Sequence, residues 1–196
     1  MENYIAKKRA NELMELYSNF GGADYIGEPV SQIEHMCQAA QFAIDEGYDD
    51  EVILAAFLHD VGHFFTVDDS HASMNGFGTV DHEKIGAYHL DQMGFSSRLC
   101  RLIVSHVQAK RYLTFKDPNY YNKLSEASKQ TLLFQGGRMI AQEAADFEKD
   151  ELFETFIRMR LWDEAAKVEN TPLPSLDYFK DLMIAHLELE PQLKNA

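Results

Sequence analysis

The residues best suited to chemistry are histidines and aspartates within apolar stretches. His59 and Asp60 directly follow the apolar run of residues 53–58. A carboxylate at such a position is costly to bury without a partner. A single buried histidine is usually a satisfied core residue, but an adjacent His–Asp pair can converge on one cation through a ring nitrogen and a carboxylate oxygen. The pair therefore indicates a buried metal site.

Further candidate ligands recur at nearly equal intervals along the chain. The steps from His35 to His59, from His59 to His82 and from His82 to His106 each span about one helix and one connection. In a helical bundle, such steps return the chain to the same level of the core. Six candidates exceed the ligands of one closed metal site. We therefore expect two metals that share Asp60 and keep open positions for water, O2 or substrate, with the ligands His35, His59, Asp60, His82, His106 and Asp163.

The elements that must position these residues are helices. Apolar periodicity, capping residues and glycine stops predict helices over residues 2–18, 31–46, 49–63, 80–94, 96–113, 125–134, 150–166 and 175–190. Ser31 and Glu34 have the spacing of a capping box. Residues 21–29, with three glycines and a proline, predict a movable loop, and 66–79 predict another. Without strand alternation or a linker, residues 1–196 are expected to form one all-α domain, a helical bundle.

Composition narrows the classes of partner. The chain is 45% hydrophobic and 26% charged, as is typical of globular proteins, and its formal net charge is −14. So acidic a surface repels nucleic acid, and an anionic substrate needs a locally positive pocket, which a metal pair can supply. No run is long enough to cross a membrane and no signal-peptide core is present, so we expect a cytoplasmic protein. Cys37 and Cys100 are expected to remain thiols.

With these residues the chain resembles the HD-domain superfamily. His82 and His106 are similar to the additional ligands of its dinuclear branch, and the similarity is closest to the PhnZ-type mixed-valent di-iron oxygenases that cleave phosphonates. The resemblance covers almost the whole chain. The motifs that carry it are Tyr25-Ile26-Gly27-Glu28, Gln32-Ile33-Glu34-His35, His59-Asp60-Val61-Gly62-His63, His82-Glu83-Lys84, residues 106–113, Gln135-Gly136-Gly137 and Arg160-Leu161-Trp162-Asp163.

The resemblance implies a di-iron centre and a reaction. One iron would be held by His35, His59 and Asp163, the other by His82 and His106, with Asp60 bridging an Fe(II)/Fe(III) pair. O2 would be the co-substrate in oxidative cleavage of the C–P bond of a small 1-hydroxyphosphonate. The expected substrate is 2-amino-1-hydroxyethylphosphonate, giving glycine and phosphate, or its N-trimethylated form, giving glycine betaine and phosphate. Hydroxymethylphosphonate is the alternative.

Two loop residues and one histidine are expected to take part in catalysis or recognition. The resemblance implies that Tyr25 occupies an iron position until substrate arrives and that Glu28 bonds a cationic group of the substrate. Many hydrolases of the superfamily have lysine where this chain has His63. If the helix persists, His63 shares a face with His59. The resemblance implies that His63 contacts the substrate or supports a ligand.

Two cations have helical spacing from proposed ligands. Lys110 follows His106 by four residues and Arg160 precedes Asp163 by three, so each shares a helix face with a ligand. A lone lysine or arginine is usually a solvated surface residue, but two at this spacing suggest a phosphonate clamp. The resemblance places two further residues, Ser128 and Gln135, near the phosphonate.

Other residues have alternative interpretations. His71, His89 and His186 have no place in the ligand pattern and are expected at the surface or in packing. Four phenylalanines, which are more typical of a core, would suit an aromatic cage for a quaternary amine: Phe64, Phe65, Phe77 and Phe115.

The same ligands permit other functions. A phosphohydrolase with two divalent metals would use them to activate water. A metal-loaded sensor without turnover is a third hypothesis.

Overall fold

A computed structural model describes residues 2–25, 27–66 and 73–194. Its elements are α1 (Glu2–Phe20), α2 (Gln32–Asp45), α3 (Asp50–Leu58), the 3₁₀ helix η1 (Val61–Thr66), α4 (His82–Gln92), α5 (Ser97–Lys116), α6 (Pro118–Lys123), α7 (Glu126–Phe134), α8 (Ala141–Phe147), α9 (Phe153–Ala165) and α10 (Leu176–Lys194). The described residues contain isolated β-bridges but no strand. The all-α prediction is confirmed.

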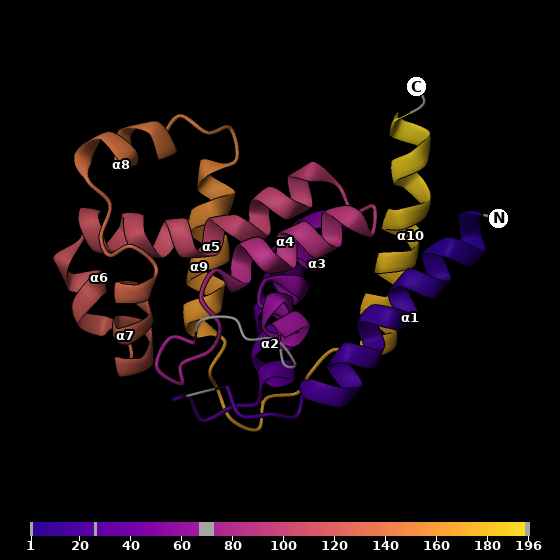
Figure 1. The fold of residues 1–196 in the computed structure, drawn as a ribbon, viewed down its shortest axis with the longest axis horizontal. Coiled ribbons are helices and arrows are strands. Elements are labelled where there is room, and N and C mark those ends of the chain that lie inside the picture. The colour runs from indigo at the N-terminus through magenta and orange to yellow at the C-terminus, as the bar shows by residue number, and fades with distance from the viewer. Residues whose placement is uncertain (1, 26, 67–72, 195–196) are drawn as a thin grey trace.

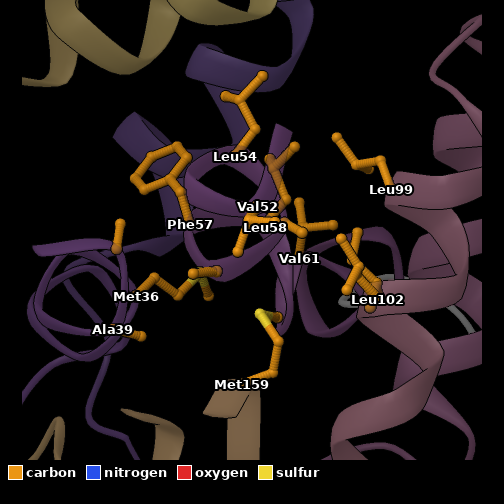
Figure 2. Close-up of a cluster of buried hydrophobic side chains, with 14 of the residues drawn as sticks. Met36, Ala39, Val52, Leu54, Phe57, Leu58, Val61, Leu99, Leu102 and Met159 are labelled. Atoms are coloured by element: carbon orange, nitrogen blue, oxygen red, sulfur yellow. The ribbon is translucent and has the colours of Figure 1, made fainter. Parts of the chain in front are cut away.

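The central helix α3 is apolar on nearly every side and organises the core. Its first turn is capped by Asp49, whose side chain accepts a hydrogen bond from the Val52 N–H. Residues 52–58 are all buried. Figure 2 shows side chains of α2, α5 and α9 around α3, including Met36 and Ala39, Leu99 and Leu102, and Met159. The helices that carry His35, His106 and Asp163 thus pack around the one that leads to His59 and Asp60.

The remaining helices occupy the two ends of the molecule. Helices α1 and α10 lie together at one end, and α6, α7 and α8 lie at the other (Figure 1). The helices that carry the predicted metal ligands lie between them. No helix among the described residues is long and apolar enough to span a bilayer.

Two glycines allow the chain to pass closely under α4. A Cβ at Gly62 would lie 1.9 Å from the carbonyl oxygen of His82, and one at Gly86 would lie 3.1 Å from the Gly62 nitrogen. Only a residue without a side chain fits at Gly62. This close approach brings the start of α4, and with it His82, against the segment that follows Asp60.

Several predicted boundaries were wrong. The helix expected over residues 49–63 ends at Leu58, and a turn at His59 and Asp60 leads into the 3₁₀ helix η1. The short helices α6 and α8 were not predicted, and their few turns give little periodic signal. Within the predicted loop of residues 66–79, residues 73–79 are non-helical. Residues 67–72, and with them His71, lie outside the described part of the chain.

The capping signals were more reliable than the helix lengths. The Ser31 and Glu34 side chains form the predicted capping box at the start of α2. Ser96 and Ser125 cap α5 and α7 through their hydroxyl groups. Cys37 and Cys100 are not joined in a disulfide.

Candidate metal centre

His35 and His59 form the first pair of facing imidazoles. His35 Nδ1 lies 2.9 Å from the carbonyl oxygen of Ala166, and His59 Nδ1 lies 2.8 Å from that of Ala56. A carbonyl oxygen only accepts hydrogen bonds, so each Nδ1 is a donor, and in the neutral ring each Nε2 presents a lone pair. The two Nε2 atoms are 3.1 Å apart and fully buried.

His82 and His106 repeat this arrangement. His82 Nδ1 lies 3.2 Å from the Thr79 carbonyl oxygen, and His106 Nδ1 lies 2.7 Å from that of Ile103. Their Nε2 atoms are again 3.1 Å apart. Two lone pairs cannot form a hydrogen bond with one another, but both can donate to a cation. The chemistry of these donors therefore fits a metal ion at each histidine pair.

Asp60 lies between the two pairs and turns one oxygen to each. Its Oδ2 is 3.6 Å from His35 Nε2 and 3.4 Å from His59 Nε2. Its Oδ1 is 3.1 Å from His82 Nε2 and 3.5 Å from His106 Nε2. This is the arrangement expected of a carboxylate shared by two metals.

Asp163 completes the first group. Its Oδ1 lies 3.5 Å from His35 Nε2, and ligand atoms of His35, His59 and Asp163 all lie within 4.8 Å of one another. The distances thus place the six predicted ligands in two sets, and their binding of metal remains a prediction. A second compact group unites Asp60, His82 and His63, so His63 lies nearer the second set than the sequence indicated.

Both aspartates remain ionised in this setting. Burial alone would raise the pKa of Asp60, but His59 and His82 together outweigh it and hold this pKa well below its usual range. Burial also acts to raise the pKa of Asp163, but Arg160, His35 and His59 together lower it well below its usual range. Burial would lower the pKa of His59, yet Asp60 together with Asp163 raises it to about 9, so a metal ion that binds Nε2 would displace a proton. The site therefore supplies two anionic oxygen ligands to compensate bound cations.

A cavity of about 70 Å³ adjoins the ligands. The metal-site residues that line it are Asp60, His82, His106 and Asp163. All seven residues predicted to act in catalysis or substrate binding also line it: Tyr25, Glu28, His63, Lys110, Ser128, Gln135 and Arg160. The tertiary structure brings together every residue of the predicted site, and their roles remain predictions.

Lys110 enters the cavity from α5. Its side chain is buried and its Nζ donates to Thr131 Oγ1 at 2.7 Å. Burial, followed by the nearby Arg160, lowers the pKa of Lys110 to about 7. An anionic ligand would compensate this buried ammonium and hold it in its charged form.

Arg160 connects the metal centre to the cavity wall. Its Nε donates to Tyr120 Oη at 2.8 Å, and its terminal nitrogens contact Asp163, Glu164 and, at 3.5 Å, Ser128 Oγ. The side chain is buried. One planar guanidinium thus fixes a proposed metal ligand and also faces the cavity.

The loop that carries Tyr25 and Glu28 is a tight turn closed by backbone hydrogen bonds. The Tyr25 N–H donates to the Val30 carbonyl oxygen and the Glu28 N–H donates to that of Tyr25, each at 2.9 Å. Gly27 has φ +81°, and a Cβ there would lie 2.8 Å from the Cβ of Ala127. Glycine is therefore required for the turn to pack against α7. Ile26, which completes this motif, lies outside the described residues.

Tyr25 and His63 each stack on a metal-site histidine. The Tyr25 and His35 rings have centroids 4.0 Å apart, and the His63 and His82 rings 4.1 Å apart. Burial, followed by the Asp60 carboxylate, raises the pKa of Tyr25 well above its usual range. The Thr79 N–H donates to His63 Nδ1 at 3.3 Å, which leaves Nε2 of a neutral ring as a donor.

The Glu28 carboxylate has two side-chain hydrogen-bond partners at the edge of the cavity. Its Oε1 accepts hydrogen bonds from Ser125 Oγ at 2.6 Å and from Lys167 Nζ at 2.8 Å. Lys167 was not among the predicted site residues. The lysine lies far from Glu28 in sequence, so no helical spacing could have connected them.

Other residues that line the cavity were not predicted from the sequence, although the helical spacing of two of them indicated it. Gln32 precedes His35 by three residues and Thr131 follows Ser128 by three, so each shares a helix face with a predicted site residue. The side-chain oxygens of Gln32 and Gln135 are buried without a hydrogen-bond partner among the described residues. A ligand with donor groups would satisfy them.

The residues assigned to packing fulfil that expectation where they are described. His89 stacks on Phe65, and His186 accepts a hydrogen bond from the Ser96 N–H. Phe64 belongs to the core, and Phe77 is the one phenylalanine of the four considered that lines the cavity.

Comparison with known proteins assigns the chain to a protein family. A model described as the HD domain matches residues 33–157. This range contains five of the six proposed ligands and ends before Asp163.

Three curated relatives align with most of the chain. An uncharacterized protein of Acanthamoeba polyphaga mimivirus is 42% identical over 187 residues, which is 95% of this chain and 84% of the relative. A second relative, from Leisingera caerulea, is the [1-hydroxy-2-(trimethylamino)ethyl]phosphonate dioxygenase (glycine-betaine-forming). It is 40% identical over 168 residues, which is 86% of this chain and 85% of the relative. The hydroxymethylphosphonate dioxygenase of Gimesia maris is 37% identical over 191 residues, which is 96% of this chain and 90% of the relative. The chain therefore belongs to the HD-domain family and, within it, to the PhnZ-type group that the sequence predicted.

Proposed function

We propose that this chain is a dioxygenase that uses an Fe(II)/Fe(III) pair and O2 to cleave the C–P bond of a small 1-hydroxyphosphonate. In the overall reaction, the substrate and one O2 yield one carboxylic acid and one phosphate. The observation that carries the proposal is the cavity, in which Lys110 and Arg160 face the same space as the two ligand sets joined by Asp60. Two relatives that share most of the chain are named as phosphonate dioxygenases.

The proposed roles divide between metal ligands and substrate contacts. His35, His59 and Asp163 would hold one iron, His82 and His106 the other, and Asp60 would bridge them. When bound, the pair would supply Lewis acidity and the redox capacity for O2. Lys110 and Arg160 would bind the phosphonate oxygens, and the side chains of Ser128 and Gln135 would complete its hydrogen bonds.

Tyr25 and His63 would act beside the ligands. Tyr25 lines the cavity and packs on His35, so we propose that it covers the centre and moves aside when substrate enters. His63 lines the cavity and stacks on His82, so we propose that it contacts the substrate beside the metal centre. Because both side chains reach the cavity, each could respond directly to ligand binding.

The substrate is one of three small phosphonates. 2-Amino-1-hydroxyethylphosphonate would give glycine and phosphate, its N-trimethylated form would give glycine betaine and phosphate, and hydroxymethylphosphonate is the alternative. Glu28 lines the cavity and is the carboxylate that would meet a cationic substituent. Comparing turnover of the three substrates by wild type and Glu28→Ala measures amine recognition: a larger loss for the amino substrates would assign it to Glu28, and equal losses would remove it.

The proposal is tested by O2 uptake and phosphate release. Protein purified anaerobically is loaded with iron and mixed with each hydroxyphosphonate, with and without O2. Phosphate release that requires O2, with one O2 consumed per phosphate, supports the dioxygenase. Equal release without O2 would establish a phosphohydrolase, and tight binding without turnover would establish a sensor. A mixed-valent spin signal that changes with substrate would identify the metal pair.

A further inference from the structure

Glu28 and Lys167 form an ion pair at the edge of the cavity. Their side chains are 9% and 13% exposed, respectively, and Nζ and Oε1 lie 2.8 Å apart. Ser125 Oγ donates to the same carboxylate oxygen. Glu28 lines the cavity, whereas Lys167 is not among the lining residues. The carboxylate is thus neutralised by a cation that does not itself line the cavity.

The position of Lys167 is fixed by the metal-site helices. The Lys167 N–H donates to the Ala165 carbonyl oxygen at 2.9 Å, and the neighbouring Ala166 carbonyl accepts from His35. Its Nζ also lies 3.2 Å from Glu164 Oε1. Because its backbone is anchored beside a proposed ligand, Lys167 can pair with Glu28 without the translational entropy loss that a free amine would suffer on binding.

We propose that Lys167 determines substrate selectivity by neutralising Glu28, so that the cavity favours a 1-hydroxyphosphonate without a cationic substituent. The inference rests on the proposed function and narrows its substrate class. An ammonium group on a substrate would meet a carboxylate whose charge Lys167 already offsets. Hydroxymethylphosphonate, the smallest candidate, has no such group.

The aromatic lining of the cavity agrees with this selectivity. A quaternary ammonium is usually held by a cage of aromatic rings. Phe77 and Tyr25 are the aromatic residues among the described lining residues apart from histidines, and Tyr25 already stacks on His35.

Selectivity can be measured by binding, independently of turnover. Iron-loaded protein without O2 is titrated calorimetrically with ethylphosphonate and 2-aminoethylphosphonate, which differ by the ammonium group and lack the hydroxyl group at carbon 1. Wild-type protein should not prefer the amino ligand. Lys167→Gln leaves Glu28 unneutralised, so the preference for the amino ligand should rise by about tenfold or more. Lys167→Arg, which retains the charge, should behave as wild type.

A double variant guards against instability of Lys167→Gln. Glu28→Gln combined with Lys167→Gln removes both charges together, and its ligand preference should equal that of wild type. A loss of preference for the amino ligand in the double variant would overturn the proposal, since it would show that Glu28 recognises the ammonium in the wild type. A lower preference in Lys167→Gln would also overturn it, by making Lys167 a positioning residue for amine binding.

A remote control tests the effect of net charge. Lys149→Gln removes the same charge from an exposed pair with Asp146 and should leave the preference unchanged. The dioxygenase proposal and the Lys167 proposal are rejected by different results. Absence of O2-dependent phosphate release by wild type would reject the dioxygenase, while the binding ratios would still decide the role of Lys167.

Discussion

The metal end and the substrate end of the cavity are held in different ways. At the metal end, backbone carbonyls orient the four proposed histidine ligands, and these carbonyls belong to helices or their flanking turns, such as Ala56 and Ile103. At the substrate end, side-chain ion pairs dominate, including Glu28 with Lys167 and Arg160 with Asp163 and Glu164. Backbone contacts fix donors rigidly, whereas ion pairs can exchange partners when a charged ligand enters. The difference suggests a fixed metal centre beside an adaptable anion site.

The largest effect should come from removing the link between the two metal sets. Asp60→Asn replaces the anionic carboxylate with a neutral amide whose nitrogen cannot serve as a ligand. Changes around metal ligands typically cost 10- to 100-fold, so loss of this shared ligand should lower phosphate release by more than about a hundredfold. Metal content measured by elemental analysis should fall in parallel. Asp146→Asn, an exposed substitution, provides the control, and full metal occupancy in Asp60→Asn would contradict a shared ligand.

The next largest effect concerns the arginine that joins the two ends. Arg160→Lys retains the charge but loses the fork that bonds Tyr120, Asp163 and Glu164. Breaking a buried ionic network should lower the free energy of unfolding by about 3 kcal/mol. Arg158→Lys on the same helix alters a surface pair with Glu46 and should cost less than about 1 kcal/mol. Urea denaturation of both variants tests the contrast, and equal losses would argue against it.

A third prediction uses the buried amine of the substrate end. The pKa of Lys110 is about 7 in the folded protein but about 10.4 in an unfolded chain. Between these values the unfolded chain binds more protons at this residue, so the contribution of Lys110 makes stability rise with pH from about 7 to about 10. Urea denaturation of ligand-free wild type and Lys110→Met across this range should show a steeper rise for wild type. Parallel curves would mean that Lys110 titrates normally.

The smallest effect is expected from the loop tyrosine. Tyr25→Phe keeps the ring that packs on His35 but removes the phenol from the cavity. If the phenol covers the metal centre, O2 consumption without substrate should increase severalfold. An oxygen electrode measures this background rate in iron-loaded protein. An unchanged rate would leave Tyr25 with a packing role only.

Local sequence signals predicted most of the fold because most helices here have strong caps and apolar periodicity. Ser31, Asp49 and Ser96 mark helix starts that the structure reproduces. The prediction failed at residues 59–63, where a 3₁₀ segment replaces the helix. The close packing of Gly62 against His82 imposes that geometry, and such a contact between segments cannot be read from periodicity.

The sequence by itself determined which residue types are available: six metal-ligand candidates in apolar surroundings, and Lys110 and Arg160 at helical spacing from two of them. Spacing within one helix is a local property, so it could be read directly. Only the tertiary structure decided that the two oxygens of Asp60 face different histidine pairs, and that Lys167 pairs with Glu28. These arrangements join residues from different helices and loops, and they arise when the core around α3 brings those segments together.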